Sequence, residues 1–161
     1  KGILFLSTPH TEDAIDFLEP LIPLYKVGSG DLTNIPFLLK IAKTGKPIII
    51  STGMATIEEI KESLIHINHY NKNIILLHCT TSYPCQMNEV NLRAMQTLEK
   101  EFGKATPTFN YQFQYIHADV GERGKTKEMV KEVVGLIKGN GFEPMIKPNS
   151  FAASVVADRY T

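Results

Sequence analysis

Cysteine and long apolar runs are scarce in this sequence of 161 residues. The two cysteines, Cys79 and Cys85, stand beside no cluster of Cys or His residues, which argues against a zinc knuckle or a redox pair and predicts free thiols. No apolar run reaches the roughly 18 residues that cross a bilayer, and residues 1–6 are too short for a secretion signal. We therefore expect a cytoplasmic protein with no membrane partner.

An excess of charge of either sign is also lacking. The 17 basic side chains balance the 17 acidic ones, so the composition gives no reason to expect nucleic acid as a partner. A chain of this length can bury one core. It is shorter than the roughly 250 residues of a complete eight-stranded α/β barrel.

Four short runs rich in Ile, Leu and Val predict buried strands. Each ends in small or hydroxylated residues, and together they cover residues 2–7, 24–28, 47–51 and 73–79. Helical patterns separate them; the clearest starts at the N-cap candidate Thr56 and carries the apolar stripe Ile60, Leu64 and Ile67. Repeated strand–helix units predict a parallel sheet. Because polar residues gather at the carboxyl ends of the strands, we favour a TIM-barrel-type α/β fold, present only in part, over an open doubly wound sheet.

The strand–helix rhythm fails after about residue 103. The remaining expectations, in chain order, are a divergent stretch at 104–124 with a weak strand at 115–124, a helix at 125–138, a turn at Gly139-Asn140-Gly141, an extended segment marked by Pro144 and Pro148, and a strand or linker at 154–157.

Lys26 stands inside an otherwise apolar strand, where a lysine is rarely buried without a partner. It could meet a phosphate or carboxylate in a barrel mouth, form a Schiff base with a carbonyl substrate, or reach solvent from an edge. Ser29 follows between two glycines, which let the backbone approach an anion. Asp31 is a candidate general acid or base, although capping of the next helix is the more frequent use of such a residue.

Two more strand ends carry polar groups. Ser51-Thr52-Gly53 places hydroxyls and a glycine before a helix, which suits an anion or an ordinary turn. At the end of the fourth strand, Thr81 and Tyr83 are best placed to face a substrate, whereas His78 is more typical of a hydrogen-bonded core residue. The five histidines show no metal-ligand spacing.

Four segments together, in this order and spacing, resemble the N-acetylneuraminate (sialic acid) synthase family: FLSTP (5–9), YKVGSGD (25–31), GKPIIISTGM (45–54) and LHCTTSYP (77–84). The resemblance covers about residues 1–103, which correspond to the third through sixth strands of a TIM barrel. It implies a transferase of the EC 2.5.1 type that condenses phosphoenolpyruvate with an N-acylated amino sugar such as N-acetylmannosamine. The products are phosphate and a nine-carbon keto acid such as N-acetylneuraminate. Sialic, legionaminic and pseudaminic acid synthases are not separated by these residues.

The resemblance also implies roles for individual residues. The phosphoenolpyruvate pocket is expected to be lined by Lys26, Ser29, Ser51 and Thr81. Lys26 would act by its charge, Asp31 would lie near the reacting centre, and these two are the expected catalytic residues. Tyr83 would contact the sugar.

The resemblance implies further partners and segments. A divalent metal ion, Mn or Mg, is expected, but its histidine ligands are not identifiable in this sequence, since His117 is a poor substitute. A homodimer is expected. Residues 150–159 resemble the linker to a missing C-terminal antifreeze-like domain, which gives a partial barrel domain at 1–149 and a linker at 150–161.

Two other functions stay open. One is a Schiff-base aldolase barrel with Lys26 as nucleophile. The other is a catalytically inactive fragment that binds a ligand or partner.

Overall fold

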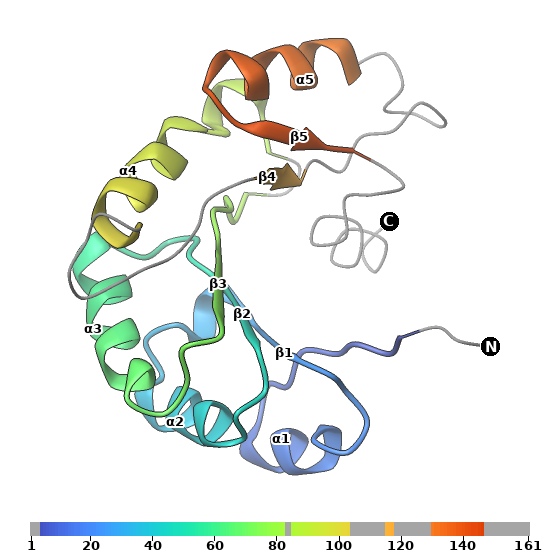
Figure 1. The fold of residues 1–161 in the computed structure, drawn as a ribbon, viewed down its shortest axis with the longest axis vertical. Helices are drawn as coiled ribbons and strands as arrows, with labels where there is room; N and C mark the ends of the chain where they lie inside the picture. Colours follow the sequence, from blue (N-terminus) through green and yellow to red (C-terminus); the bar gives the residue numbers. More distant parts are fainter. Residues whose placement is uncertain (1–3, 83–84, 104–114, 118–129, 147–161) are drawn as a thin grey trace. The chain divides into compact units, whose positions relative to one another are not determined.

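A computed structural model of the chain describes residues 4–82, 85–103, 115–117 and 130–146 (Figure 1). Internal contacts divide the chain into two compact units, residues 1–111 and 112–161. The predicted boundary at residue 149 and the segment 154–157 lie outside the described residues.

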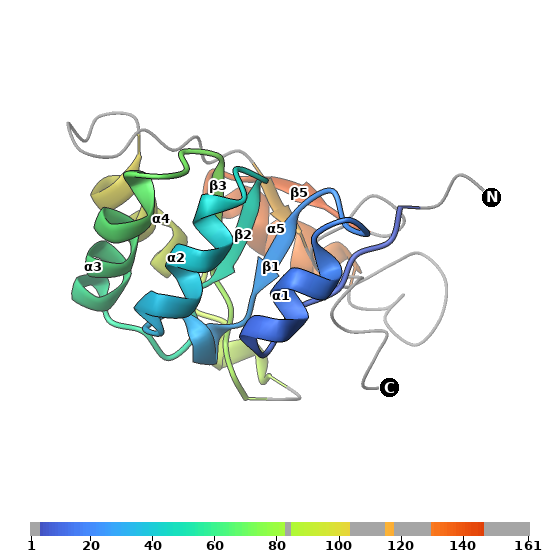
Figure 2. The ribbon, with the colours of Figure 1, turned by 90° about the horizontal axis from the view of Figure 1, so that it is seen from below.

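The first unit is built on a three-stranded parallel sheet in the order β1-β2-β3. Its elements are α1 (Glu12–Leu18), β1 (Tyr25–Val27), the 3₁₀ turn η1 (Ser29–Asp31), α2 (Ile35–Lys43), β2 (Ile48–Ser51), α3 (Ile57–Asn68), β3 (Ile74–Leu77), the 3₁₀ turn η2 (Met87–Glu89) and α4 (Arg93–Phe102). Helices α1, α2 and α3 lie along one face of the sheet (Figures 1 and 2). Three predicted strands are thus confirmed, each shorter than expected. No described helix is long and apolar enough to cross a membrane.

The two faces of this sheet differ in burial. The register places Lys26 beside Ile49 and Ile49 beside Ile75, and side chains paired in this way share a face. On the opposite, helix-covered face, Tyr25 and Ile48 are 0% exposed, whereas Ile75 is 50% exposed. The strands are apolar on both faces in sequence, yet burial is more complete on the helix side.

The strand predicted at residues 2–7 is wrong for the part of it that the structure describes. Residues 4–7 belong to no strand, and the described sheet begins with β1. Leu4 is 73% exposed and Phe5 is 51% exposed. A strand exists only where a neighbour satisfies its backbone hydrogen bonds, so an apolar run alone does not make one.

Helix α3 begins where the sequence predicts. The Thr56 hydroxyl accepts a hydrogen bond from the Glu59 N–H at 3.2 Å, and the Glu59 carboxylate accepts one from the Thr56 N–H at 2.8 Å. This reciprocal capping box satisfies two amide groups that the helix itself leaves without acceptors. The predicted stripe of Ile60, Leu64 and Ile67 is buried at no more than 2% exposure.

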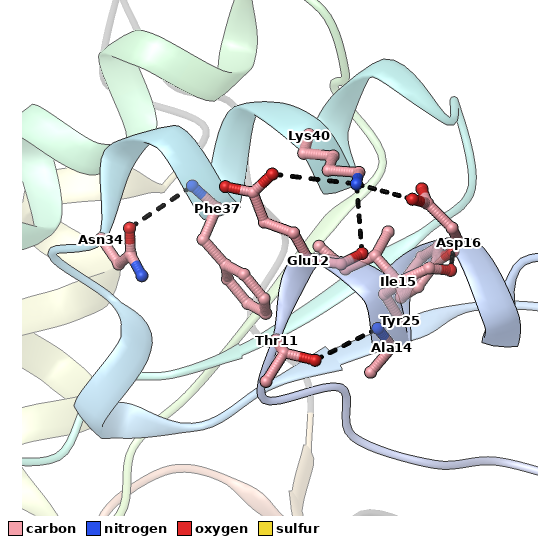
Figure 3. Close-up of polar contacts among 9 residues, drawn as sticks. All are labelled: Thr11, Glu12, Ala14, Ile15, Asp16, Tyr25, Asn34, Phe37 and Lys40. Atoms are coloured by element: carbon pink, nitrogen blue, oxygen red, sulfur yellow. Dashed lines mark hydrogen bonds and ion pairs between the residues drawn. The ribbon is translucent and has the colours of Figure 1, made fainter.

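Polar contacts join α1 to its neighbours (Figure 3). Lys40 of α2 donates to the Asp16 carboxylate at 2.8 Å and to the Glu12 carbonyl at 3.1 Å. The Tyr25 hydroxyl of β1 donates to the Ile15 carbonyl at 3.0 Å. The pKa of Lys40 is raised, mainly by its hydrogen bond to Asp16.

At the amino ends of the strands, two side chains bind backbone carbonyls. Lys46, just before β2, donates to the Glu19 carbonyl and to the Ile22 carbonyl, the latter at 2.8 Å. Asn71, just before β3, donates to the Lys46 carbonyl at 2.7 Å. These bonds form a carbonyl clasp, defined by Lys46 and Asn71, at the edge of the sheet opposite the predicted site.

The second unit contains a strand–helix–strand element. Strand β4 (Tyr115–His117) pairs in parallel with β5 (Glu143–Met145), and α5 (Val130–Gly139) lies between them in the chain. The weak strand, the helix and the extended segment are confirmed within the described residues. Gly141 has φ 83°, and the Phe142 N–H returns to the Ile137 carbonyl at 3.3 Å, so the predicted turn does end the helix.

Candidate active site

Lys26 lies at the edge of the sheet where the carboxyl ends of β1, β2 and β3 meet. Its Nζ donates to Ser51 Oγ at 2.7 Å and to the Val27 carbonyl at 3.3 Å, so the side chain turns back across the sheet and does not extend into solvent. Burial lowers the pKa of Lys26, and nearby Cys79 acts in the opposite direction. Among the described residues, no carboxylate forms an ion pair with Lys26. This leaves a partly buried cation at the strand ends that can accept an anionic ligand.

The Ser29 hydroxyl joins three strand ends. It accepts a hydrogen bond from the Gly53 N–H, after β2, at 3.1 Å. It also lies 3.2 Å from Cys79 Sγ, after β3. Ser29 itself follows β1, so one short side chain links β1, β2 and β3 at the edge that carries Lys26.

Thr81 lies beside this junction, on the wall of a pocket. The pocket has a volume of about 330 Å³ and is lined by Met54, Cys79, Thr80, Thr81, Ser82 and Glu89. Four of the predicted site residues, Lys26, Ser29, Ser51 and Thr81, therefore follow or belong to three adjacent strand ends. Tyr83 lies outside the described residues.

Asp31 does not cap the following helix. The cap of α2 is Asn34, whose side-chain oxygen accepts from the Phe37 N–H at 3.4 Å. The sequence suggested helix capping as the more frequent use of a residue such as Asp31. This prediction is wrong, because the 3₁₀ turn η1 intervenes and helix α2 begins only after Asn34. The Asp31 carboxylate instead lies 3.6 Å from His10 Nδ1.

His78 forms a hydrogen-bond contact, as the sequence predicts, but it follows β3 and is half-buried, so it is not a core residue. Its Nε2 lies 2.8 Å from the Val90 carbonyl and so joins the end of β3 to the segment after η2. Thr52 is structural too, since its hydroxyl donates to the Leu77 carbonyl at 3.0 Å.

Sequence reasoning named Gly53 only as part of a strand end that suits an anion, and it did not find Cys79 or Glu89 as neighbours of the site. Cys79 was expected to be an ordinary free thiol, and it is free, but its sulfur contacts Ser29. The sequence feature that could have indicated Cys79 is its position at the end of a predicted strand, at the same edge of the sheet as Ser29 and Ser51.

The described residues do not fit a divalent metal ion. They contain no group of three or more His, Cys, Asp or Glu side chains able to hold one. His10 and Asp31 form only a pair, and Lys26 beside Ser51 and Ser29 supplies a cation with hydroxyls, a set that suits an anion.

The sequence itself matches a known family. The model of the NeuB family matches residues 1–108, which is more than half of the chain. The chain therefore belongs to the NeuB family. The matched residues nearly coincide with the first compact unit, which contains the whole candidate site.

Several curated relatives are named as sugar-acid synthases. The N,N'-diacetyllegionaminic acid synthase of Campylobacter jejuni is 50% identical over 105 residues, covering 63% of this chain and 31% of that protein. The human N-acetylneuraminate-9-phosphate synthase is 41% identical over 102 residues, covering 63% of this chain and 28% of that protein. The chain spans about a third of the length of these relatives.

The fold also matches solved structures. The N-acetylneuraminic acid (sialic acid) synthetase of Leptospira borgpetersenii has a TM-score of 0.67 and 27% identity, covering 90% of this chain and 46% of that one. The predicted fold class, α/β with TIM-barrel-type parallel repeats that form part of a barrel, is confirmed. A second model, described as Ribonuclease H-like, matches residues 85–161, which is less than half of the chain and assigns no family.

Proposed function

We propose that the strand ends of β1, β2 and β3 bind phosphoenolpyruvate, and that the chain supplies this half of an EC 2.5.1-type sugar-acid synthase. The second substrate is an N-acylated amino sugar, N-acetylmannosamine or a similar compound. The observation that carries the proposal is the partly buried Lys26 ammonium, which binds Ser51 Oγ at 2.7 Å and has no described carboxylate partner.

Phosphoenolpyruvate suits this arrangement because it carries a phosphate and a carboxylate on a small carbon skeleton. Lys26 offsets the negative charge, and the hydroxyls of Ser29, Ser51 and Thr81 donate to ligand oxygens. In the proposed reaction the methylene carbon of phosphoenolpyruvate bonds to the sugar aldehyde carbon. Water supplies the new keto oxygen, and the carbon–oxygen bond to phosphate breaks.

The remaining roles rest on the family resemblance. Asp31, in the 3₁₀ turn after β1, handles a proton or orients the sugar, and Tyr83 contacts the sugar. A divalent metal ion, homodimer formation and a cytoplasmic location stay part of the proposal. The described residues do not supply a metal site, so no step is assigned to the ion.

Sedimentation of the purified chain tests whether it forms the proposed homodimer.

Binding of phosphoenolpyruvate tests the proposal directly. Isothermal titration calorimetry should detect binding to the wild type, and Lys26→Met should lower the affinity at least about tenfold, or about 1.4 kcal/mol. Lys72→Gln is the matched control, because Lys72 is an exposed lysine before β3, at the opposite edge of the sheet. An equal loss of phosphoenolpyruvate affinity in both variants would mean that only the net charge of the chain matters, and it would overturn the assignment of the site to Lys26.

Turnover is tested separately. Phosphate release from phosphoenolpyruvate is measured with N-acetylmannosamine and manganese, and the keto acid is measured in the same samples. Binding without phosphate release would leave the chain a ligand-binding part of a synthase, which its coverage of about a third of the relatives makes a real alternative.

A Schiff-base aldolase is favoured by one observation, the lowered pKa of Lys26, because a neutral amine is the nucleophile in such enzymes. Borohydride reduction in the presence of pyruvate, followed by peptide mass spectrometry, would reveal a covalent adduct on Lys26. We expect no adduct, since Nζ is engaged by Ser51 and acts through its charge.

A further inference from the structure

Gly53 is enclosed by the ends of the two outer strands. A Cβ atom on Gly53 would lie 2.9 Å from Ser29 Oγ, 3.0 Å from Thr81 Cγ2 and 3.1 Å from the Cys79 carbonyl oxygen. Apart from atoms of its own residue and the two adjacent residues, a real Cβ atom essentially never lies within 3.0 Å of a heavy atom, and a contact at 3.0–3.4 Å is tighter than nine in ten real Cβ contacts. The neighbours come from the loops after β1 and β3, so both sides of the glycine are closed.

The need for glycine here is steric. The described glycines with positive φ are Gly45 and Gly141, so Gly53 does not adopt the left-handed conformation that favours this residue. Its N–H donates to Ser29 Oγ at 3.1 Å. This bond occupies one lone pair of the hydroxyl, whose proton can be directed at Cys79 Sγ, 3.2 Å away, or at an acceptor such as a ligand oxygen.

We propose that Gly53 is a positioning residue of the anion site. Without a side chain it lets the loops after β1 and β3 close onto the end of β2, and this contact sets the spacing between Ser29 and Thr81. The inference rests on the proposed function, since Ser29 and Thr81 are the hydroxyls proposed to bind phosphoenolpyruvate. It assigns to Gly53 no contact with the substrate.

The first test is the affinity for phosphoenolpyruvate, measured by calorimetry. Gly53→Ala should lower it at least about tenfold, because the added methyl pushes Ser29 and Thr81 apart. Gly135→Ala is the control: Gly135 lies in α5, and a Cβ there has no heavy atom within 4 Å. Wild-type affinity in Gly53→Ala would overturn the proposal.

The second test is rescue by a smaller neighbour. Thr81→Ser removes the methyl group that a Gly53 Cβ would meet at 3.0 Å and keeps the hydroxyl. The double variant should bind phosphoenolpyruvate at least about threefold more tightly than Gly53→Ala alone, a coupling that a general loss of stability does not produce. No recovery would count against the spacing role.

A third test needs no ligand. Iodoacetamide labelling followed by peptide mass spectrometry gives the rate at Cys79, whose sulfur contacts Ser29, with Cys85 as an internal reference. Gly53→Ala should raise the Cys79/Cys85 ratio at least about threefold, because the junction opens, and the double variant, in which one of the close contacts is relieved, should show a smaller rise. An unchanged ratio refutes the spacing role. If the wild type fails to bind phosphoenolpyruvate, the proposed function falls and this ratio still decides the role of Gly53.

Discussion

The two faces of the β1–β3 sheet are formed by alternate residues of the same strands, and they have different roles. On one face Tyr25, Val27 and Ile50 pack against helices and are 0% exposed. On the other face lie Lys26, Ile49 and Ile75, partly open. The helix-covered face provides packing energy, and the other presents a cation at the strand ends. Stability and binding are therefore expected to respond to different substitutions only one residue apart.

The largest expected contrast is between two isoleucines. Ile50→Ala opens a cavity in the central strand on the buried face and should lower the free energy of unfolding by about 2 to 5 kcal/mol. Ile75→Ala, at a position that is 50% exposed, should cost at most about 1 kcal/mol. Urea denaturation of both variants measures the difference. Equal losses would break the distinction between the faces.

The next effect concerns the hydroxyl of Tyr25. Tyr25→Phe removes its 3.0 Å hydrogen bond to the Ile15 carbonyl, which still accepts from the Glu19 N–H. We expect a loss of about 1 kcal/mol, observed as a lower urea midpoint with an unchanged slope. Phosphoenolpyruvate binding should stay at the wild-type level, and a change in affinity would show that the helix face also shapes the site.

The partly open face, through Lys26, should make the free energy of unfolding depend on pH. The pKa of Lys26 is lowered in the folded state from a usual value of 10.5, so between the two values the unfolded chain holds more protons. The free energy of unfolding of the wild type should therefore rise with pH, relative to Lys26→Met, as the pH approaches 10.5 from below. Denaturant melts of both proteins at several alkaline pH values measure this slope. A falling difference would contradict the burial of the ammonium group.

The smallest effect is expected at Lys40, whose pKa is shifted the other way. Its pKa is raised, so its contribution is present below 10.5 and is lost as the pH rises through the folded-state value. Lys40→Gln should slightly lower the urea midpoint at low salt, and the difference should vanish at about 1 M salt, because exposed ion pairs are screened. A difference that persists at high salt would show that Lys40 acts by packing.

The sequence predicts strand ends well and contacts between strand ends poorly. Lys26, Ser29, Ser51 and Thr81 could be located because each belongs to or follows an apolar run, and parallel strands bring such ends to one edge. The junction of Ser29 with Gly53 and Cys79 depends on register across three strands, which no local pattern encodes.

Two other differences have local causes. Residues 4–7 have the composition of a strand, but hydrogen-bond partners, and not composition, decide strand formation. Asp31 has the residue type of a helix cap, yet Asn34 takes that role because a 3₁₀ turn intervenes. In both cases the residue types suit the predicted structure, but the backbone follows a course in which that structure does not form.

The carbonyl clasp of Lys46 and Asn71 has an evolutionary consequence. It holds the amino ends of the strands through backbone carbonyls, which every residue has, so it does not depend on the side chains in the loops at the opposite edge. Mutations in the loops after β1, β2 and β3 can then accumulate without loosening this frame. Such a division lets one ancestral scaffold diversify its chemistry, in keeping with relatives whose names specify different sugar acids.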